Sequence, residues 1–330
     1  MLPGPSTAPA PEGKASLPPA PTPLVEAVPN VSEGRRADVL QELAAAAGGV
    51  RGAHLLDWSA DPSHNRSVFT MAGSANDLAA AVLRLFAVAV EHVDLRRHRG
   101  EHPRIGAVDV VPFVPLGETS MDDCVDLARR VGREVADRLG IPVFWYEEAA
   151  VHESRRPLEA IRRGQFEGLS AKMHAPGWSP DCGPATPHPS AGASAVGARA
   201  PLIAFNVNLT TDDVAAARRI AGKIRERDGG LPGVKALGIR LGHRGIAQVS
   251  TNVVDYRRSS LETVLEAVLR EAADLGVEVG GTELVGLVPA EALPAAGAER
   301  LRIDGFTPDR VLDVRLHRAA AGSPAPDGPR

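Results

Sequence analysis

Two histidines, one glutamate and two arginines lie together in the segment His98–Asp109, which reads His-Arg-Gly-Glu-His-Pro-Arg-Ile-Gly-Ala-Val-Asp. An apolar run that predicts a strand follows it directly. Histidine exchanges protons near neutral pH, and arginine holds anionic groups in place. An ordinary surface loop has no need of this mixture, so the segment is a candidate active site.

The spacing of His98 and His102 is that of a metal-binding pair on one face of a helix. Gly100 and Pro103 disfavour a helix there, so the sequence predicts no metal at this segment. The two cysteines of the chain lie far apart without a Cys-x-x-Cys motif. This pattern excludes a cysteine-based zinc site and indicates a reducing compartment.

The chain of 330 residues is long enough for two modest domains. Its net charge of −4 and isoelectric point near 6.2 argue against nucleic acid or an anionic membrane surface as the main partner. No apolar run is long enough to span a bilayer, so we expect a soluble cytoplasmic protein.

The second half of the chain predicts the order β-α-β-β-α-β, which is the split ferredoxin-like unit. Its helices are expected after Thr210 or Thr211 and after Ser259 or Ser260, where apolar residues recur at helical spacing. Its strands are expected at Pro201–Leu209, Lys235–Leu241, Ile246–Tyr256 and Val277–Val288.

The first half predicts the same order, extended by one helix and one strand. The expected strands are Val25–Pro29, Ala53–Trp58, Ser67–Ala72, Ala107–Pro115 and Pro142–Tyr146. The expected helices are Arg35–Ala47, Ala75–Val93 and Ser120–Leu139. We therefore predict an α+β fold of two ferredoxin-like βαββαβ subdomains, each an α/β-sandwich, with a ligand-binding cleft or channel between them.

Proline-rich segments predict where regular structure stops. Residues 1–23 contain eight prolines and no apolar stretch, which indicates a disordered tail rather than a signal peptide. The predicted division is a tail over 1–23, one subdomain over 24–200, a second over 201–318, and another disordered tail over 319–330.

The segment Trp178–Gly192 has four prolines and two glycines, which exclude a helix or a central strand. Composition leaves two interpretations open. The segment is a linker, or it is a stiff loop whose proline rings and exposed amides contact a ligand.

Six motifs between Leu24 and Ala292 occur in the order found in one known family. They are Val28–Gly34, Asn65–Thr70, His98–Asp109, Gly183–Gly192, Ile203–Leu209 and Ala247–Asn252. Together they resemble the formiminotransferase domain of glutamate formiminotransferase, the folate-dependent enzyme of histidine breakdown. The resemblance implies two subdomains around a substrate channel, and it implies a homodimer.

The implied reaction moves a formimidoyl group between N-formimidoyl-L-glutamate and N5 of tetrahydrofolate, which serves histidine and one-carbon metabolism. Tetrahydrofolate is then a co-substrate, and the partners are small molecules. In vertebrate relatives a cyclodeaminase domain follows, and we expect that second activity to be absent from this chain. The family's vertebrate pattern has a second acid where this chain has Ser59, in Asp57-Trp58-Ser59.

The resemblance also implies roles for individual residues. His102 aligns with the catalytic histidine, whose pKa near 6.5 suits a general base and acid. Arg66 and Arg104 are expected to bind substrate carboxylates through their guanidinium forks. The other substrate-binding candidates are Asn65, Asn206, Asn208 and Asn252, the last three being strand residues facing the cleft or turn residues. The folate-binding candidates are Gly183, Pro184, Ala185, Thr186, Pro187, His188, Pro189, Ser190, Ala191 and Gly192.

Two other functions compete with the transferase. One is a folate-binding protein without catalysis, against which the proton-exchanging His102 argues. The other is an enzyme acting on a different N5 one-carbon folate, such as 5-formyltetrahydrofolate, with a nucleotide. No Walker-type loop is present to bind that nucleotide.

Overall fold

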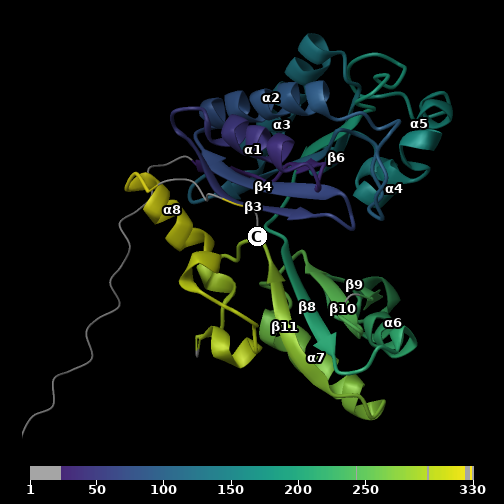
Figure 1. Ribbon diagram of the computed structural model, residues 1–330, viewed down its shortest axis with the longest axis vertical. Helices are drawn as coiled ribbons and strands as arrows, with labels where there is room; N and C mark the ends of the chain where they lie inside the picture. The colour runs from purple at the N-terminus through teal and green to yellow at the C-terminus, as the bar shows by residue number, and fades with distance from the viewer. Residues whose placement is uncertain (1–23, 243, 296, 324–327, 329–330) are drawn as a thin grey trace, which may run out of the picture.

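The computed structural model describes residues 24–242, 244–295, 297–323 and 328. The tail expected over 1–23 lies outside these residues, as do 324–327, 329 and 330 of the expected C-terminal tail. Two β-sheets with helices packed on them form the α+β fold that the sequence predicts (Figure 1).

The larger sheet has the order β3-β4-β1/β2-β5-β7-β6, in which β1 and β2 share one position because both pair antiparallel with β4 and β5. Its strands are β1 (Leu24–Ala27), β2 (Asn30–Val31), β3 (Ala53–Asp61), β4 (Arg66–Gly73), β5 (Val108–Leu116), β6 (Val143–Glu147) and β7 (Ser194–Ala198). The sequence predicts these strands except the two-residue β2 and β7. β7 lies parallel to both β5 and β6 and joins them.

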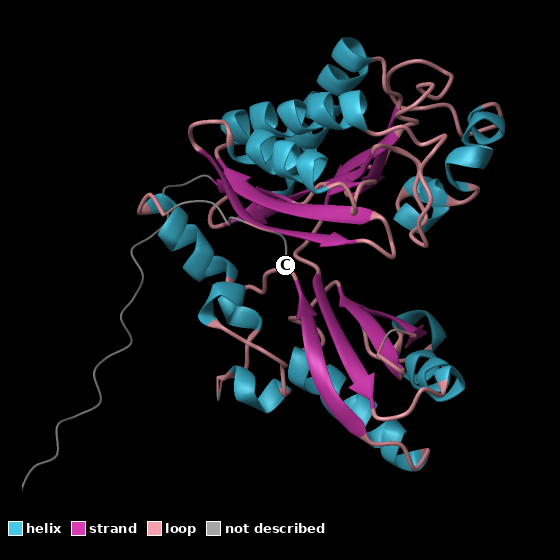
Figure 2. Ribbon diagram, in the orientation of Figure 1, coloured by secondary structure: helices cyan, strands magenta, loops and turns pink. Residues whose placement is uncertain are grey.

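Three helices cover the face of this sheet that points away from the second sheet (Figure 2). They are α1 (Ala37–Gly48), α2 (Ala75–His92) and α3 (Met121–Leu139). Ser74 and Ser120 cap α2 and α3 by accepting hydrogen bonds from the backbone N–H of the third helical residue. The apolar faces of the helices bury Leu43, Leu85 and Val131 fully, which fixes the scaffold behind the site.

The smaller sheet has the order β11-β8-β10-β9, with antiparallel neighbours throughout. Its strands and helices follow the chain in the predicted order: β8 (Ile203–Leu209), α6 (Val214–Ile224), β9 (Val234–Leu241), β10 (Ile246–Val253), α7 (Leu261–Asp274) and β11 (Val279–Val285). Ser260 caps α7, as expected. The cap of α6 is Asp213 instead of Thr210 or Thr211, because its carboxylate accepts the N–H of Ala215.

The sequence did not predict three further helices. They lie on or next to the face of the larger sheet that points toward the second sheet, which is its inner face. They are α4 (Leu158–Arg162), α5 (Gln165–Met173) and α8 (Leu312–Ala320). In α8, which crosses the expected boundary at residue 318, Leu312 packs with Leu56 and Ala72, and Arg315 donates a 2.7 Å hydrogen bond to the Leu56 carbonyl. Short 3₁₀ helices lie at Glu153–Arg155, Glu226–Asp228, Ala290–Ala292, Ala298–Leu301 and Pro308–Arg310.

A pocket of about 300 Å³ lies between the inner faces of the two sheets, where the sequence predicts a cleft. Arg66 and Tyr146 line it from the larger sheet, and Asn252 lines it from the smaller one. An ion pair of 3.0 Å between Nζ of Lys235 and Oε1 of Glu159 joins the two units at its wall. Within the described residues, no helix is both long and apolar enough to cross a membrane.

Candidate functional site

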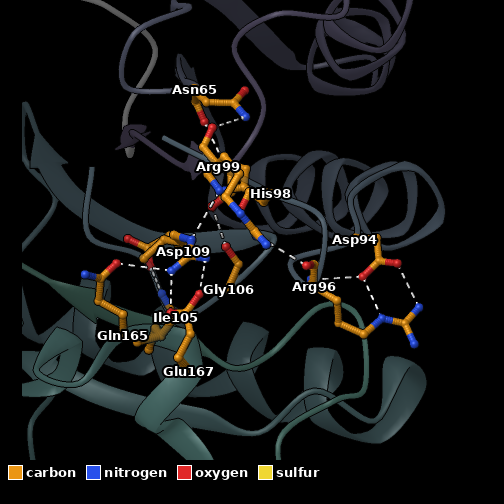
Figure 3. Close-up of polar contacts among 12 residues, drawn as sticks. Asn65, Asp94, Arg96, His98, Arg99, Ile105, Gly106, Asp109, Gln165 and Glu167 are labelled. Carbon is orange, nitrogen blue, oxygen red and sulfur yellow. Dashed lines mark hydrogen bonds and ion pairs between the residues drawn. The ribbon is translucent and has the colours of Figure 1, made fainter. Parts of the chain in front are cut away.

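The segment His98–Asp109 folds as an irregular loop that leads into β5 (Figure 3). Asp109 is buried, and its Oδ1 accepts a 2.7 Å hydrogen bond from the backbone N–H of Ile105. Gly106 pairs with Gly192 in an isolated bridge. A Cβ on Gly106 would come within 2.0 Å of the Ala193 carbonyl oxygen, so this close approach requires glycine.

His102 is half-buried and lies against the side chain of Arg66. Nη1 of Arg66 donates a 2.7 Å hydrogen bond to Nε2 of His102, so the proton of the neutral ring is on Nδ1. Burial, and then the positive charges of Arg66 and Arg162, lower the pKa of His102 from 6.5 to about 2. The structure thus holds His102 as a neutral imidazole beside a pocket residue.

Arg162, which the sequence did not single out, completes this cluster as the last residue of α4. Its Nε and Nη2 both donate to Oδ2 of Asp109, at 2.8 and 2.5 Å. The C-terminus of α4 is fixed by Nζ of Lys172, which donates to the Ile161 carbonyl at 2.7 Å. Arg162 and Arg66 line the same pocket.

Arg104 does bind a carboxylate in the predicted bidentate manner, but the carboxylate belongs to Glu167. The two hydrogen bonds are 2.8 and 2.7 Å long, and they lower the pKa of Glu167 to about 2. Nε of Arg104 donates to Nδ1 of His98, whose Nε2 therefore donates to the Asn65 carbonyl at 2.8 Å. A substrate contact for Arg104 stays a prediction, while its observed contacts position the loop.

The side chain of Asn65 also holds loops together. Its Oδ1 accepts from the Gly34 N–H, and its Nδ2 donates to the Arg99 carbonyl, each at 3.0 Å. These bonds fix the start of β4, where Arg66 follows. Because both ends of the Asn65 amide have protein partners, its direct role in substrate binding stays a prediction.

The stretch Gly183–Gly192 is a loop without helix or strand, as the sequence predicts. It closes in a turn in which His188 and Gly192 exchange backbone hydrogen bonds of 2.8 and 2.9 Å. It packs on the candidate active-site loop, since the Ala191 carbonyl accepts the Ala107 N–H at 2.9 Å. The described residues that line the pocket include none of this stretch, so its folate-binding role stays a prediction.

All three candidate asparagines of the smaller sheet lie within strands and not in turns. Oδ1 of Asn206 accepts the Thr251 N–H at 3.2 Å, and Oδ1 of Asn208 accepts from Nε2 of Gln248 at 2.8 Å. Asn252 is exposed and lines the pocket. The structure therefore brings Asn252, and not Asn206 or Asn208, to the pocket that Arg66 lines.

Glu26 is a second residue that the sequence did not single out. It lies on β1 and lines the pocket with a side chain that is nearly buried, at 8% exposure. Burial raises the pKa of Glu26 from 4.5 to about 7, although the positive charge of Arg199 opposes that shift. Among the described residues, no group of three or more side chains is arranged to hold a metal ion.

The raised pKa of Glu26 predicts a pH-dependent stability. The folded protein binds this proton more tightly than the unfolded chain, so the contribution is present at low pH and is lost as pH rises from 4.5 through 7. We expect the unfolding free energy of the wild type, relative to Glu26→Gln, to fall by roughly 2–3 kcal/mol between pH 5 and 8. Urea denaturation of both proteins at the two pH values measures this difference. The exposed Glu91→Gln variant is the control, and an equal pH response of Glu26→Gln and the wild type would refute the assignment.

Similarity to known proteins covers both units of the structure. Residues 24–199 match the family model described as the formiminotransferase domain, N-terminal subdomain, and residues 204–304 match the model described as the formiminotransferase domain. The two models meet in the short connection between β7 and β8.

Relatives of known name match over most of this chain. The glutamate formimidoyltransferase of Streptococcus pyogenes serotype M1 is 44% identical over 283 residues, which are 86% of this chain and 95% of that protein. The glutamate formimidoyltransferase of Thermoplasma acidophilum is 42% identical over 299 residues, covering 90% and 98%. The formimidoyltransferase-cyclodeaminase of Sus scrofa is 42% identical over 315 residues, which are 93% of this chain and 58% of that longer protein. The chain belongs to the formiminotransferase family of enzymes.

Proposed function

We propose that the protein transfers a formimidoyl group between N-formimidoyl-L-glutamate and N5 of tetrahydrofolate, as the names of its relatives suggest. The observation that carries the proposal is the contact between Arg66 and His102. It holds a neutral imidazole, whose Nε2 accepts a proton once Arg66 releases it, beside a cation that is able to bind an anionic substrate. The reaction needs both groups close together.

The proposed step begins when N5 of tetrahydrofolate attacks the amidine carbon of N-formimidoylglutamate. The new C–N5 bond forms as N5 loses its proton to Nε2 of His102. The tetrahedral intermediate then breaks its bond to the glutamate nitrogen, which receives that proton from His102. The products are 5-formimidoyltetrahydrofolate and glutamate, and the imidazole returns to its neutral state. Positioned proton transfer of this kind contributes about 10²–10⁴-fold in rate.

Two surfaces lie on different parts of the candidate active-site loop and suit the two substrates. The pocket of about 300 Å³ has the size of an amino-acid ligand more than of a whole folate. The loop Gly183–Gly192 packs on Ala107 at the other part of the candidate active-site loop, and its residues Gly183–Thr186 are exposed. We assign the amino-acid substrate to the pocket and the folate to this loop.

The proposal is tested with purified protein, N-formimidoylglutamate and tetrahydrofolate. We expect glutamate to appear in equal amount to the N-formimidoylglutamate consumed, and only when tetrahydrofolate is present. Consumption of 5-formyltetrahydrofolate instead would favour the competing folate activity. Folate binding without turnover of either compound would favour a binding protein.

The family resemblance also supports two expectations about the cellular role and the oligomeric state. The protein is expected to act in the cytoplasm, in histidine degradation and one-carbon metabolism. It is also expected to form a homodimer. Sedimentation equilibrium measures that state directly, and a monomer at micromolar concentration would contradict it.

A further inference from the structure

Arg66 has an unusual hydrogen-bond partner for a guanidinium in a pocket. Its Nη1 donates to a neutral imidazole nitrogen at 2.7 Å, whereas carboxylates are the acceptors that match its fork. Burial, and then the positive charge of Arg162, lower the pKa of Arg66. A half-buried cation beside a second cation is stabilised by an added anion.

Arg162 is that second cation, and one edge of its guanidinium already donates hydrogen bonds to Asp109. Its bonds to Asp109 come from Nε and Nη2, so Nη1 is not engaged by that carboxylate. Asp109 is buried and also bound to the Ile105 N–H, which fixes Arg162 relative to the active-site loop. Asp109 therefore pairs directly with Arg162, while Arg66 feels the charges of Asp109 and Asp61 only at longer range.

We propose that the α-carboxylate of the amino-acid substrate binds between Arg66 and Arg162 and replaces Nε2 of His102 as the hydrogen-bond acceptor of Arg66. The inference rests on the proposed function. Its consequence is that substrate binding frees the Nε2 lone pair, which is the group that must accept the proton from N5. Without substrate, the same lone pair is occupied by Arg66.

The position of the cluster selects the α-carboxylate over the distal one. The reacting nitrogen of glutamate is attached to the carbon that carries the α-carboxylate, whereas three carbons separate it from the distal carboxyl carbon. A carboxylate bound by Arg66 lies next to His102 because Arg66 itself touches Nε2. The α-carboxylate, one carbon away from the reacting nitrogen, reaches Arg66 with that nitrogen beside the imidazole without folding of the side chain, whereas the distal carboxylate has to fold back to do so.

The charges that face His102 support the same exchange. They come from Arg66 on β4, Arg162 on α4, His64 in the β3–β4 turn and His98 in the same loop. Burial, and then the Arg66 and Arg162 charges, keep the imidazole neutral in the free protein. An anion placed between the two arginines weakens their field and makes His102 a stronger base in the complex.

A chemical double-mutant cycle tests the inference. N-formimidoyl-4-aminobutyrate keeps the amidine and the distal carboxylate of the substrate but lacks the α-carboxylate. We expect Arg162→Lys to lower kcat/KM for N-formimidoylglutamate by about 10–100-fold, since Lys keeps a cation near Asp109 but loses the fork. For N-formimidoyl-4-aminobutyrate we expect a change of less than about 3-fold, because the partner is already missing.

The matched control is Arg163→Lys, the exposed neighbour at the end of α4, for which we expect no change with either substrate. An equal loss of kcat/KM by Arg162→Lys with both substrates would overturn the inference. Absence of transfer by the wild type with N-formimidoylglutamate would instead count against the proposed function.

A measurement on the wild type decides the same point without any variant. The ¹⁵N chemical shift of Nε2 in His102 reports whether Arg66 donates to it. We expect L-glutamate, the product, to move this shift, and 4-aminobutyrate to leave it in place. Equal responses to both ligands, or none to either at saturation, would contradict the displacement of Nε2 by the α-carboxylate.

Discussion

We expect His102→Ala to lower formimidoyl transfer by about 10²–10⁴-fold while tetrahydrofolate binding changes little. The variant removes the neutral nitrogen that Arg66 contacts, but it leaves the loop Gly183–Gly192 and its backbone hydrogen bond to Ala107 in place. Steady-state kinetics measures the first quantity. Isothermal titration with tetrahydrofolate measures the second.

The control for this variant is His174→Ala. His174 is exposed, and its Nδ1 contacts the Ser170 carbonyl at the end of α5. Its removal is expected to leave kcat and KM unchanged. If His102→Ala retains wild-type turnover, the role assigned to the imidazole is wrong. If it loses both turnover and folate binding, the loop has been displaced and the variant reports on structure alone.

The elements that the sequence predicts are those with a local signal. The helices α2 and α7 combine apolar residues at a spacing of three and four with a serine cap, so each is specified within its own segment. The order β-α-β-β-α-β of the second half follows from the same periodicities. Local patterns therefore suffice for the scaffold.

The strand β7 lacks such a signal because its position in the sheet dictates small residues. It reads Ser-Ala-Val-Gly-Ala and is buried throughout between two parallel neighbours. A Cβ on Gly197 would come within 2.2 Å of the Tyr146 carbonyl oxygen. The residues that permit this packing have low strand propensity, so the segment does not resemble a strand when it is examined alone.

The partners of the arginines in the candidate site are also beyond what the sequence alone predicts. A guanidinium in a motif predicts a carboxylate partner, and Arg104 has one, in Glu167, which lies 63 positions further along the chain. Arg162 reaches Asp109 from 53 positions away, out of a helix of five residues. Sequence patterns identify the type of contact, but tertiary structure alone decides which arginine is left to face the pocket.

The second large effect is expected at Asp109, whose carboxylate joins the candidate active-site loop to α4. Its exposure is 2%, and it accepts from both the Ile105 N–H and Arg162. Asp109→Asn removes the negative charge and leaves Arg162, with a side-chain exposure of 15%, without its counter-ion. We expect a loss of about 3–5 kcal/mol in the unfolding free energy, measured by urea denaturation.

A paired variant separates the charge effect from the geometry of the site. In Asp109→Asn/Arg162→Gln the uncompensated cation is gone, so we expect part of the stability to return while transfer stays low, because the arginine pair is broken. Asp94→Asn, which removes the half-buried partner of the exposed Arg96 just before the loop, is the control and is expected to change stability little. If Asp109→Asn unfolds with the same urea midpoint as the wild type, the buried carboxylate does not hold this loop. Recovery of full transfer in the paired variant would show that Arg162 acts only as the partner of Asp109.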